Sequence, residues 1–136
     1  WRIVGEGDYG ETMRKDIKKY DLQDNIIMMG YLENPIPMVN KSDLFVLQSY
    51  SEGYPMSVNE ALAVDTPVLV TNYPSSAEQV ENKVTGYIAE NDFDSVYEAL
   101  HYVINNKQEL KNMRDNLKKR DKSKYDNIDN LLRIMR

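Results

Sequence analysis

The sequence predicts an α/β fold in which a parallel sheet is flanked by helices. Apolar segments of strand length alternate with segments of helical periodicity along the 136 residues. Residues 44–47 and 68–70 are apolar at every position, which is typical of parallel strands covered on both faces. The length suits one domain that folds without a disulfide or a metal. Because the chain starts with Trp1 directly on a predicted strand, we expect residues 1–136 to form a single partial domain.

Five strands are expected, over residues 1–4, 25–29, 43–48, 67–71 and 86–89. Residues 43–48 are apolar on both faces, and we therefore place this strand at the centre of the sheet. In a Rossmann-like sheet of this kind, ligands bind where the carboxyl ends of the strands lead into helices. A site is therefore expected in the loops at residues 5–8, 30–33 and 49–57.

Helices are expected over residues 9–20, 35–40, 56–64, 75–81, 93–106, 107–120 and 125–135. Asp8 and Glu11 resemble a capping box at the start of the first helix. Asn91 and Asp92 cap the helix that begins at Phe93. The apolar stripe of that helix consists of Val96, Leu100, Val103 and Ile104. Residues 107–136 form the C-terminal helices of the domain.

The composition excludes several classes of protein. The chain has no cysteine and a single histidine, which excludes a zinc site built from Cys and His and a cysteine nucleophile. The absence of cysteine fits a reducing cytoplasm. No apolar run reaches the length of a membrane span, and the start has no signal-peptide pattern.

The charge is unevenly distributed along the chain. Residues 1–100 carry a net charge of −10 and residues 101–136 carry +5. An acidic body argues against a nucleic-acid partner, because no basic face covers it. The basic tail is most simply a solvated helix face, although contact with an anionic membrane or a protein stays open. A non-catalytic interaction domain is therefore one alternative, and its electrostatic docking would fade at high salt.

A second alternative comes from Gly5-x-Gly7-x-x-Gly10, which has the spacing of a dinucleotide-binding loop. The motif follows a strand and opens a helix, and Glu33 lies where an acid that binds the ribose is expected. An NAD-binding module of an oxidoreductase is therefore an open interpretation. It would require a catalytic Lys, Tyr or His that the sequence does not place.

Asp92-Phe93-Asp94 has the Asp-x-Asp form that some sugar-nucleotide enzymes use to hold a metal. It stands directly before an amphipathic helix, where acidic side chains cap free N–H groups and meet the positive end of the helix dipole. We therefore interpret it as a helix cap and expect no metal site.

The strongest constellation lies where the third expected strand ends, and it is bounded by Glu52 and Glu60. A turn with Gly53 and Pro55 separates that strand from the next helix. The first N–H groups of the helix, together with its dipole, make a site for a diphosphate. The two carboxylates would then accept hydrogen bonds from diols on either side. Surface acids at a helix start are an equally good interpretation of the spacing alone.

At these residues the sequence resembles the retaining GT-B glycosyltransferases of family 4, also called glycosyl transferases group 1. Glu52 and Glu60 fit the Glu-x7-Glu signature of that family. The residues around them, 51–55, 59–63 and 66–71, resemble the family's sequence pattern. Residues 3–7, 27–32 and 42–47 resemble earlier landmarks, and residues 78–80, 85–88 and 91–92 resemble later ones. The resemblance covers almost the whole chain and implies the C-terminal half of a GT-B fold, truncated at its N-terminus.

The resemblance also implies a nucleotide-sugar donor site. Glu52 would bind hydroxyls of the donor sugar as the catalytic residue, and Glu60 would hold the ribose diol. The implied donor-binding residues are Gly5, Gly7, Tyr31, Leu32, Glu52, Gly53, Tyr54, Pro55, Met56, Ser57 and Glu60. Gly5 and Gly7 would border the phosphates, and Tyr31 and Leu32 the base. The family implies transfer with retention and without a metal or other cofactor, to a glycan or a lipid-linked acceptor, in envelope polysaccharide synthesis.

The sequence departs from the family at three points. Asp65 stands where the family usually has glycine, in a turn that Asp tolerates in a left-handed conformation. Ser75 and Ser76 replace a glycine pair, so no donor contact is carried over to them. As a third difference, we expect that residues 1–136 do not include the N-terminal acceptor domain and the first strand of the donor domain that the family has. We therefore expect the isolated chain to be inactive, and the longer protein to be cytoplasmic with an optional peripheral contact at the membrane.

Overall fold

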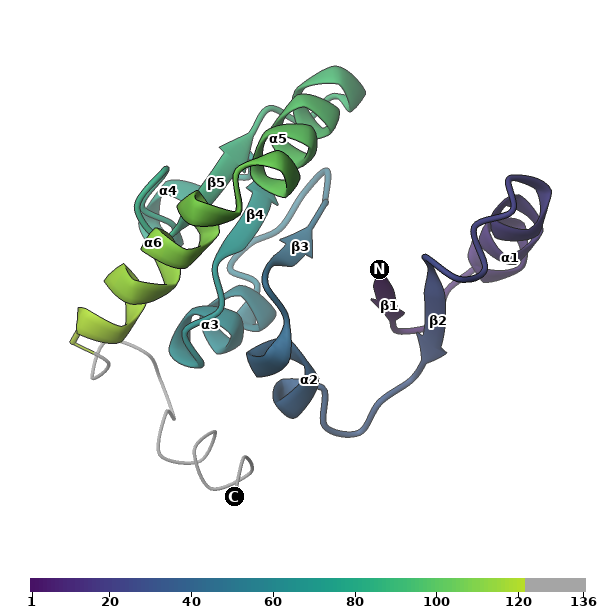
Figure 1. The fold of residues 1–136 in the computed structure, drawn as a ribbon, viewed down its shortest axis with the longest axis horizontal. Coiled ribbons are helices and arrows are strands. Elements are labelled where there is room, and N and C mark those ends of the chain that lie inside the picture. Colours follow the sequence, from purple (N-terminus) through teal and green to yellow (C-terminus); the bar gives the residue numbers. More distant parts are fainter. Residues whose placement is uncertain (122–136) are drawn as a thin grey trace. The chain divides into compact units, whose positions relative to one another are not determined.

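The computed structural model describes residues 1–121 and divides the chain into two compact units, Trp1–Pro35 and the chain from Ile36 onward (Figure 1). Among the described residues, the first unit contains a two-stranded parallel sheet with one helix, and the second contains a three-stranded parallel sheet flanked by helices. This alternation of parallel strands and helices confirms the predicted fold class. The described strands and helices all begin and end within two residues of their predicted bounds. The helix expected over residues 125–135 lies outside the described residues. That residues 1–136 form one domain stays a prediction.

The first unit pairs β1 (Arg2–Val4) with β2 (Ile27–Gly30) in parallel, with Ile3 opposite Met28. The N–H group of Gly5 donates a hydrogen bond of 2.8 Å to the carbonyl oxygen of Gly30. Gly30 has a φ angle of +66°, which its lack of a Cβ atom allows. The loops that follow the two strands therefore begin side by side.

The capping box predicted at Asp8 and Glu11 is wrong. Helix α1 (Gly10–Lys19) has Tyr9 as its N-cap, and no side chain caps it. The reason is the preceding turn, in which the N–H group of Gly10 donates to the carbonyl of Gly7 at 3.0 Å. This turn shifts the helix start, so Asp8 lies one residue before the N-cap position.

The second unit is built around three parallel strands in the order β3-β4-β5, with bounds Phe45–Leu47, Val68–Thr71 and Gly86–Ala89. Its helices are α2 (Ile36–Lys41), α3 (Met56–Ala63), α4 (Ser76–Gln79), α5 (Phe93–Asn105) and α6 (Lys107–Lys119). All five lie against or beside this sheet in Figure 1. The unit is therefore an alternating α/β layer structure.

The prediction that residues 43–48 form the central strand is wrong for the described residues. In this sheet β4 lies between β3 and β5, and all four residues of β4 are buried. Each residue of β3 is half-buried. Apolar side chains on both faces show that helices cover the two faces of a strand. They do not show whether it has a neighbour on each side, because that depends on hydrogen bonds along its edges.

The core lies on both faces of β4. On one face Val68 and Val70 pack with Val58 and Leu62 of α3 and with Leu117 of α6. On the other face Leu69 packs in a cluster with Tyr87, Val103 and Met113. Helix α6 contributes to both clusters, so it joins the two layers.

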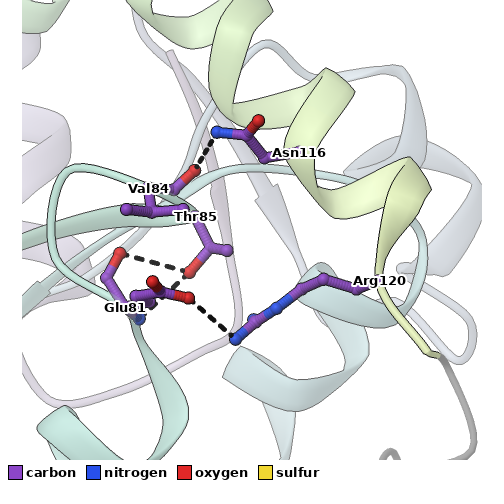
Figure 2. A network of polar contacts seen from close by, with 5 residues as sticks. All are labelled: Glu81, Val84, Thr85, Asn116 and Arg120. Atoms are coloured by element: carbon purple, nitrogen blue, oxygen red, sulfur yellow. Dashed lines mark hydrogen bonds and ion pairs between the residues drawn. The ribbon is translucent and has the colours of Figure 1, made fainter.

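Helix α6 is also joined to the turn before β5 by polar contacts (Figure 2). The side-chain amide of Asn116 donates to the carbonyl oxygen of Val84 at 3.1 Å. Arg120, at the end of the helix, forms an ion pair with Glu81 at 3.4 Å. Thr85 closes the turn by donating from its hydroxyl to the carbonyl oxygen of Glu81.

Helix α5 confirms one prediction made from the sequence and corrects another. Asp92 is the N-cap of α5, and its carboxylate accepts a hydrogen bond of 2.8 Å from the N–H group of Ser95, which confirms the cap. Ile104 does not belong to the apolar stripe, because it is 54% exposed while Val103 is fully buried. Val96 and Val103, seven residues apart, lie on the same side of the helix and are buried, whereas residue 104 lies at the edge of that side.

Asp65, in the turn after α3, has a φ angle of +62°. The left-handed conformation predicted for this residue is therefore confirmed. Asp accepts it more readily than most residues other than glycine do, because its short side chain can form local hydrogen bonds.

Candidate functional site

The loop that carries Glu52 begins at the carboxyl end of β3 and leads directly into α3. Pro55 is the N-cap of α3, with φ −66° and ψ +116°, and no side chain caps this helix. The first N–H groups of a helix have no partner within the helix, so those of Met56 and Ser57 can meet a ligand. The start of α3 is thus an uncapped positive helix end at the edge where the strands finish.

The two signature glutamates stand on either side of this helix end. Glu52 lies in the loop, and Glu60 lies in the second turn of α3. Both residues are half-buried, whereas Gly53 and Tyr54 between them are exposed. The geometry thus brings together residues 52–57 and Glu60, as the sequence analysis expects, with carboxylates available as hydrogen-bond acceptors.

The beginning of the loop is held by β4 and by the residue before the α5 cap. The hydroxyl of Thr71 donates to the carbonyl oxygen of Ser49 at 2.6 Å and accepts from the N–H group of Ser49 at 2.9 Å. The side-chain amide of Asn91 donates to the same carbonyl at 3.2 Å. The chain therefore leaves β3 in a defined direction.

The end of the loop is held by residues from the α4 region. The hydroxyl of Ser75 donates to the carbonyl oxygen of Gly53 at 2.5 Å. The side-chain amide of Gln79 donates to the carbonyl oxygen of Pro55 at 3.1 Å and to Asn59 at 3.0 Å. Both anchoring side chains are buried.

Tyr73 lies beneath the same loop, with its side chain 1% exposed. Burial, then the negative charge of Glu52, then Tyr54, raise the pKa of Tyr73 from 10.0 to about 12. Tyr73 therefore stays neutral through the physiological range and remains a hydrogen-bond donor.

The other predicted donor-binding residues belong to the first unit. Gly5 and Gly7 follow β1, and Tyr31 and Leu32 follow β2. Because Gly5 is hydrogen-bonded to Gly30, these two loops lie at the same end of their sheet. Tyr31 is 74% exposed and Leu32 is half-buried. The structure groups these four residues with each other, in a different unit from Glu52 and Glu60.

The surroundings of Gly7 and Gly10 do not favour the dinucleotide-binding interpretation. In that motif the third glycine is needed for close packing of helix against strand. A Cβ atom added at Gly7 or Gly10 would meet nothing within 4 Å. Helix α1 also has no buried residue. The close packing of helix against strand that requires glycine in the dinucleotide-binding motif is therefore absent at Gly7 and Gly10.

Residues 1–121 also bear on other classes of site. Within that part of the chain, no three His, Asp or Glu side chains gather as a metal site would need. None of the helices described there has the length and apolar character needed to cross a membrane.

Four residues that hold this site are not predicted to belong to it from the sequence: Thr71, Tyr73, Ser75 and Gln79. Ser75 stands out in the sequence only as a departure from a glycine pair. The one available signal in the sequence is the position of Gln79, beside Val80 on a short predicted helix between two buried strands. This position suggests that the amide is buried, and a buried amide needs hydrogen-bond partners. Its partners Pro55 and Asn59 lie 24 and 20 residues away along the chain, so the sequence does not name them.

Comparison with solved structures shows which fold the chain has. The UDP complex of Alr3699/HepE from Anabaena matches 98% of this chain with a TM-score of 0.79 and 18% identity. The match spans 38% of that protein, and at this identity it shows the fold, which is that of the GT-B glycosyltransferases.

Comparison of sequences identifies the family. The family model described as "Glycosyl transferases group 1" matches residues 1–120, and the chain belongs to this family. The capsular polysaccharide biosynthesis glycosyltransferase CapM of Staphylococcus aureus is 29% identical over 74% of the chain. A UDP-Gal:α-D-GlcNAc-diphosphoundecaprenol α-1,3-galactosyltransferase of Escherichia coli is 33% identical over 77% of it. These matches span 27% and 28% of the two relatives' own lengths.

Proposed function

We propose that this chain is the donor-binding domain of a retaining glycosyltransferase and that its ligand is a nucleoside diphosphate sugar. The observation that carries the proposal is the uncapped start of α3 at the carboxyl end of β3, with Glu52 and Glu60 beside it. A helix N-terminus favours a diphosphate, and half-buried carboxylates favour hydroxyl groups. UDP in the HepE complex and the UDP-sugar in the name of the Escherichia coli relative support the same ligand class.

Each part of the loop has a proposed role. Backbone N–H groups from Gly53 to Ser57 bind the diphosphate. The Glu60 carboxylate accepts hydrogen bonds from the ribose hydroxyls, and that of Glu52 accepts them from the donor sugar. In the first unit, Gly5 and Gly7 border the phosphates and Tyr31 with Leu32 contacts the base.

The chemistry proposed for this site is departure of the nucleoside diphosphate from the anomeric carbon, with retention of configuration. The transition state resembles an oxocarbenium ion, so the site must stabilise negative charge that grows on the leaving diphosphate. The α3 dipole and the N–H groups at its start supply that stabilisation. Glu52 orients the sugar through its hydroxyls. We propose that no metal or other cofactor takes part.

The names of the relatives support the proposed biological context. A longer protein that includes an N-terminal acceptor domain would transfer the sugar to a glycan or lipid-linked acceptor during synthesis of an envelope polysaccharide. We propose that it works in the cytoplasm, with an optional peripheral contact at the membrane face, and that residues 1–136 alone bind nucleotide weakly and have no turnover.

Isothermal titration of the chain with UDP, GDP and NAD tests the proposal. We expect one of UDP and GDP to bind with a Kd below about 1 mM. Glu60→Ala should weaken that binding at least tenfold, because the ribose loses its acceptor. Glu98→Ala, at an exposed acid of α5, is the matched control and should leave the Kd unchanged. Tight binding of NAD with no binding of either nucleoside diphosphate would refute the proposal.

A further inference from the structure

Gln79 has a hydrogen-bond arrangement that allows only one orientation of its side-chain amide. Its amide group donates to Pro55 and Asn59, and its oxygen accepts from the hydroxyl of Tyr73 at 3.0 Å. A backbone carbonyl can only accept, so turning the amide over would place two oxygens against each other at Pro55. The side chain is 5% exposed, which keeps water from replacing any lost partner.

The residues that Gln79 contacts are those that set the start of α3. Pro55 is the N-cap, and its carbonyl also accepts from the N–H group of Val58 at 3.3 Å. Asn59 is buried in the helix itself. Because no side chain caps α3, the direction of its first turn depends on Pro55, and Gln79 holds Pro55 from outside the helix.

Ser75 holds the middle of the same loop. Its hydroxyl donates to the carbonyl oxygen of Gly53, the residue after Glu52. A glycine at this position, which the family pattern predicts, has no side chain with which to do this. The two anchors act on successive parts of the loop and come from one short segment, residues 75–79.

We propose that Ser75 and Gln79 are positioning residues that hold the Glu52 loop and the first turn of α3 in the conformation that binds donor. This inference rests on the proposed function. Neither residue touches the ligand, since both are buried beneath the loop. Their effect reaches the diphosphate through the backbone of Gly53 and Pro55.

Hydrogen exchange of residues 50–58 tests the positioning without any ligand. In Gln79→Glu at pH 8 the carboxylate cannot donate to Pro55 or Asn59, and we expect exchange in this segment to rise about tenfold. Burial raises the pKa of a carboxyl group, so lowering the pH toward 5 favours its neutral form, whose single O–H can again donate to one of the two partners. Protection corrected for intrinsic rates should then return part of the way toward wild type. Among the titratable groups nearby, Tyr73 donates to residue 79, and Glu52 and Tyr54 act electrostatically on Tyr73; the wild-type chain at both pH values corrects for their effects. Because Glu and Gln have the same shape, the comparison of the two pH values changes the charge and the hydrogen-bond donor at residue 79 while the packing volume stays constant.

Matched variants separate anchoring from general loss of stability. Ser75→Ala should raise exchange around Gly53 with less effect at residue 58. Gln108→Leu removes an amide that donates only to Asn112 on the exposed face of α6, and it should leave the loop unchanged. If exchange at residues 50–58 stays at the wild-type rate in Gln79→Glu at pH 8, or does not recover at low pH, the proposal is wrong.

Nucleotide titration of the same variants distinguishes the two proposals. If both proposals hold, Gln79→Glu at pH 8 should weaken binding of the nucleotide that the wild type binds, UDP or GDP, at least fivefold, and Gln108→Leu should not. If the wild-type chain binds neither UDP nor GDP, the proposed function fails, while the exchange comparison still decides whether Gln79 and Ser75 anchor the loop. If the loop loosens and binding of that nucleotide is unchanged, the loop conformation does not control the donor site and the inference fails.

Discussion

A Cβ atom placed on Gly86 would stand 2.3 Å from the carbonyl oxygen of Val68 on the adjacent strand. It would also lie 2.7 Å from Cγ2 of Val68, whose side chain is fully buried. The two residues face each other in the parallel register of β4 and β5. Gly86 is therefore required by the close approach of the two strands.

Gly86→Ala should lower the free energy of unfolding by about 3 kcal/mol, because the added methyl group forces β4 and β5 apart. Urea denaturation followed by circular dichroism measures this change. Gly53→Ala is the control, since its Cβ would meet nothing within 4 Å, and it should cost less than about 0.5 kcal/mol. Equal losses in the two variants would contradict the steric explanation.

The stability of variants at Asp65 should depend on how readily the new residue adopts a φ angle of +62°. Asp65→Gly should change stability by less than about 1 kcal/mol, because relief of strain offsets the greater freedom of the unfolded chain. Asp65→Val should lose about 2 kcal/mol, since a β-branched residue is strongly disfavoured in this conformation. Thermal unfolding of both variants decides this, and a valine variant as stable as the glycine variant would contradict it.

The stability of the second unit should fall steeply in alkali. The pKa of Tyr73 and that of Tyr87 are each raised from 10.0 to about 12, chiefly by burial. Because the folded-state pKa exceeds the unfolded one, this stability is complete below pH 10 and is lost as the pH rises toward 12. Each tyrosine contributes a slope of about −1.4 kcal/mol per pH unit in that window.

Urea denaturation at pH 9, 10 and 11 measures the slope. Tyr73→Phe should remove one tyrosine's share of it, at the cost of a lost hydrogen bond to Gln79. Tyr50→Phe, at a side chain 85% exposed, should leave the slope as it is. An unchanged slope in Tyr73→Phe would contradict the assignment.

The Asp92 cap predicts a specific loss in α5. Asp92→Ala should destabilise the protein by about 1 kcal/mol, because the N–H group of Ser95 loses its acceptor. Asp94→Ala, one residue into the helix, removes only a favourable dipole contact and should cost about 0.3 kcal/mol. The same variants test the Asp-x-Asp motif as a metal site. If millimolar Mn²⁺ raises the Tm of the wild type but not of Asp92→Ala, the capping interpretation is incomplete.

The two links between α6 and the turn before β5 should differ in strength. Asn116→Ala removes a part-buried hydrogen bond to Val84 and should cost about 1 kcal/mol. Glu81→Gln removes the charge from an ion pair whose side chains are 34% and 57% exposed, and it should cost about 0.3 kcal/mol. Chemical denaturation at low and high salt compares them, and only the second effect should fade with salt. The reverse order would show that the ion pair dominates.

Local patterns in the sequence were enough to predict the elements of the fold. Strands such as residues 68–71 and helices such as residues 93–105 were found because periodicity and capping act over a few neighbouring residues. The same holds for Asp92 as a cap and for the left-handed Asp65. The placement of residues 52–57 and Glu60 around one helix start also follows from a strand, a turn and a helix in succession.

Only the tertiary structure decided which distant residues meet. In the structure β4 is the central strand of its sheet, and Ile104 is exposed to solvent. Helix α1 has Tyr9 as its N-cap, one residue after the position expected from the capping box. The tertiary structure also joined Gln79 and Ser75 to the Glu52 loop. These partners are separated by more than twenty residues, and hydrogen bonding between them depends on how α4 packs beneath the loop. The sequence by itself determined which segments form strands and helices and where carboxylates stand along them, whereas packing determined what holds those carboxylates in place.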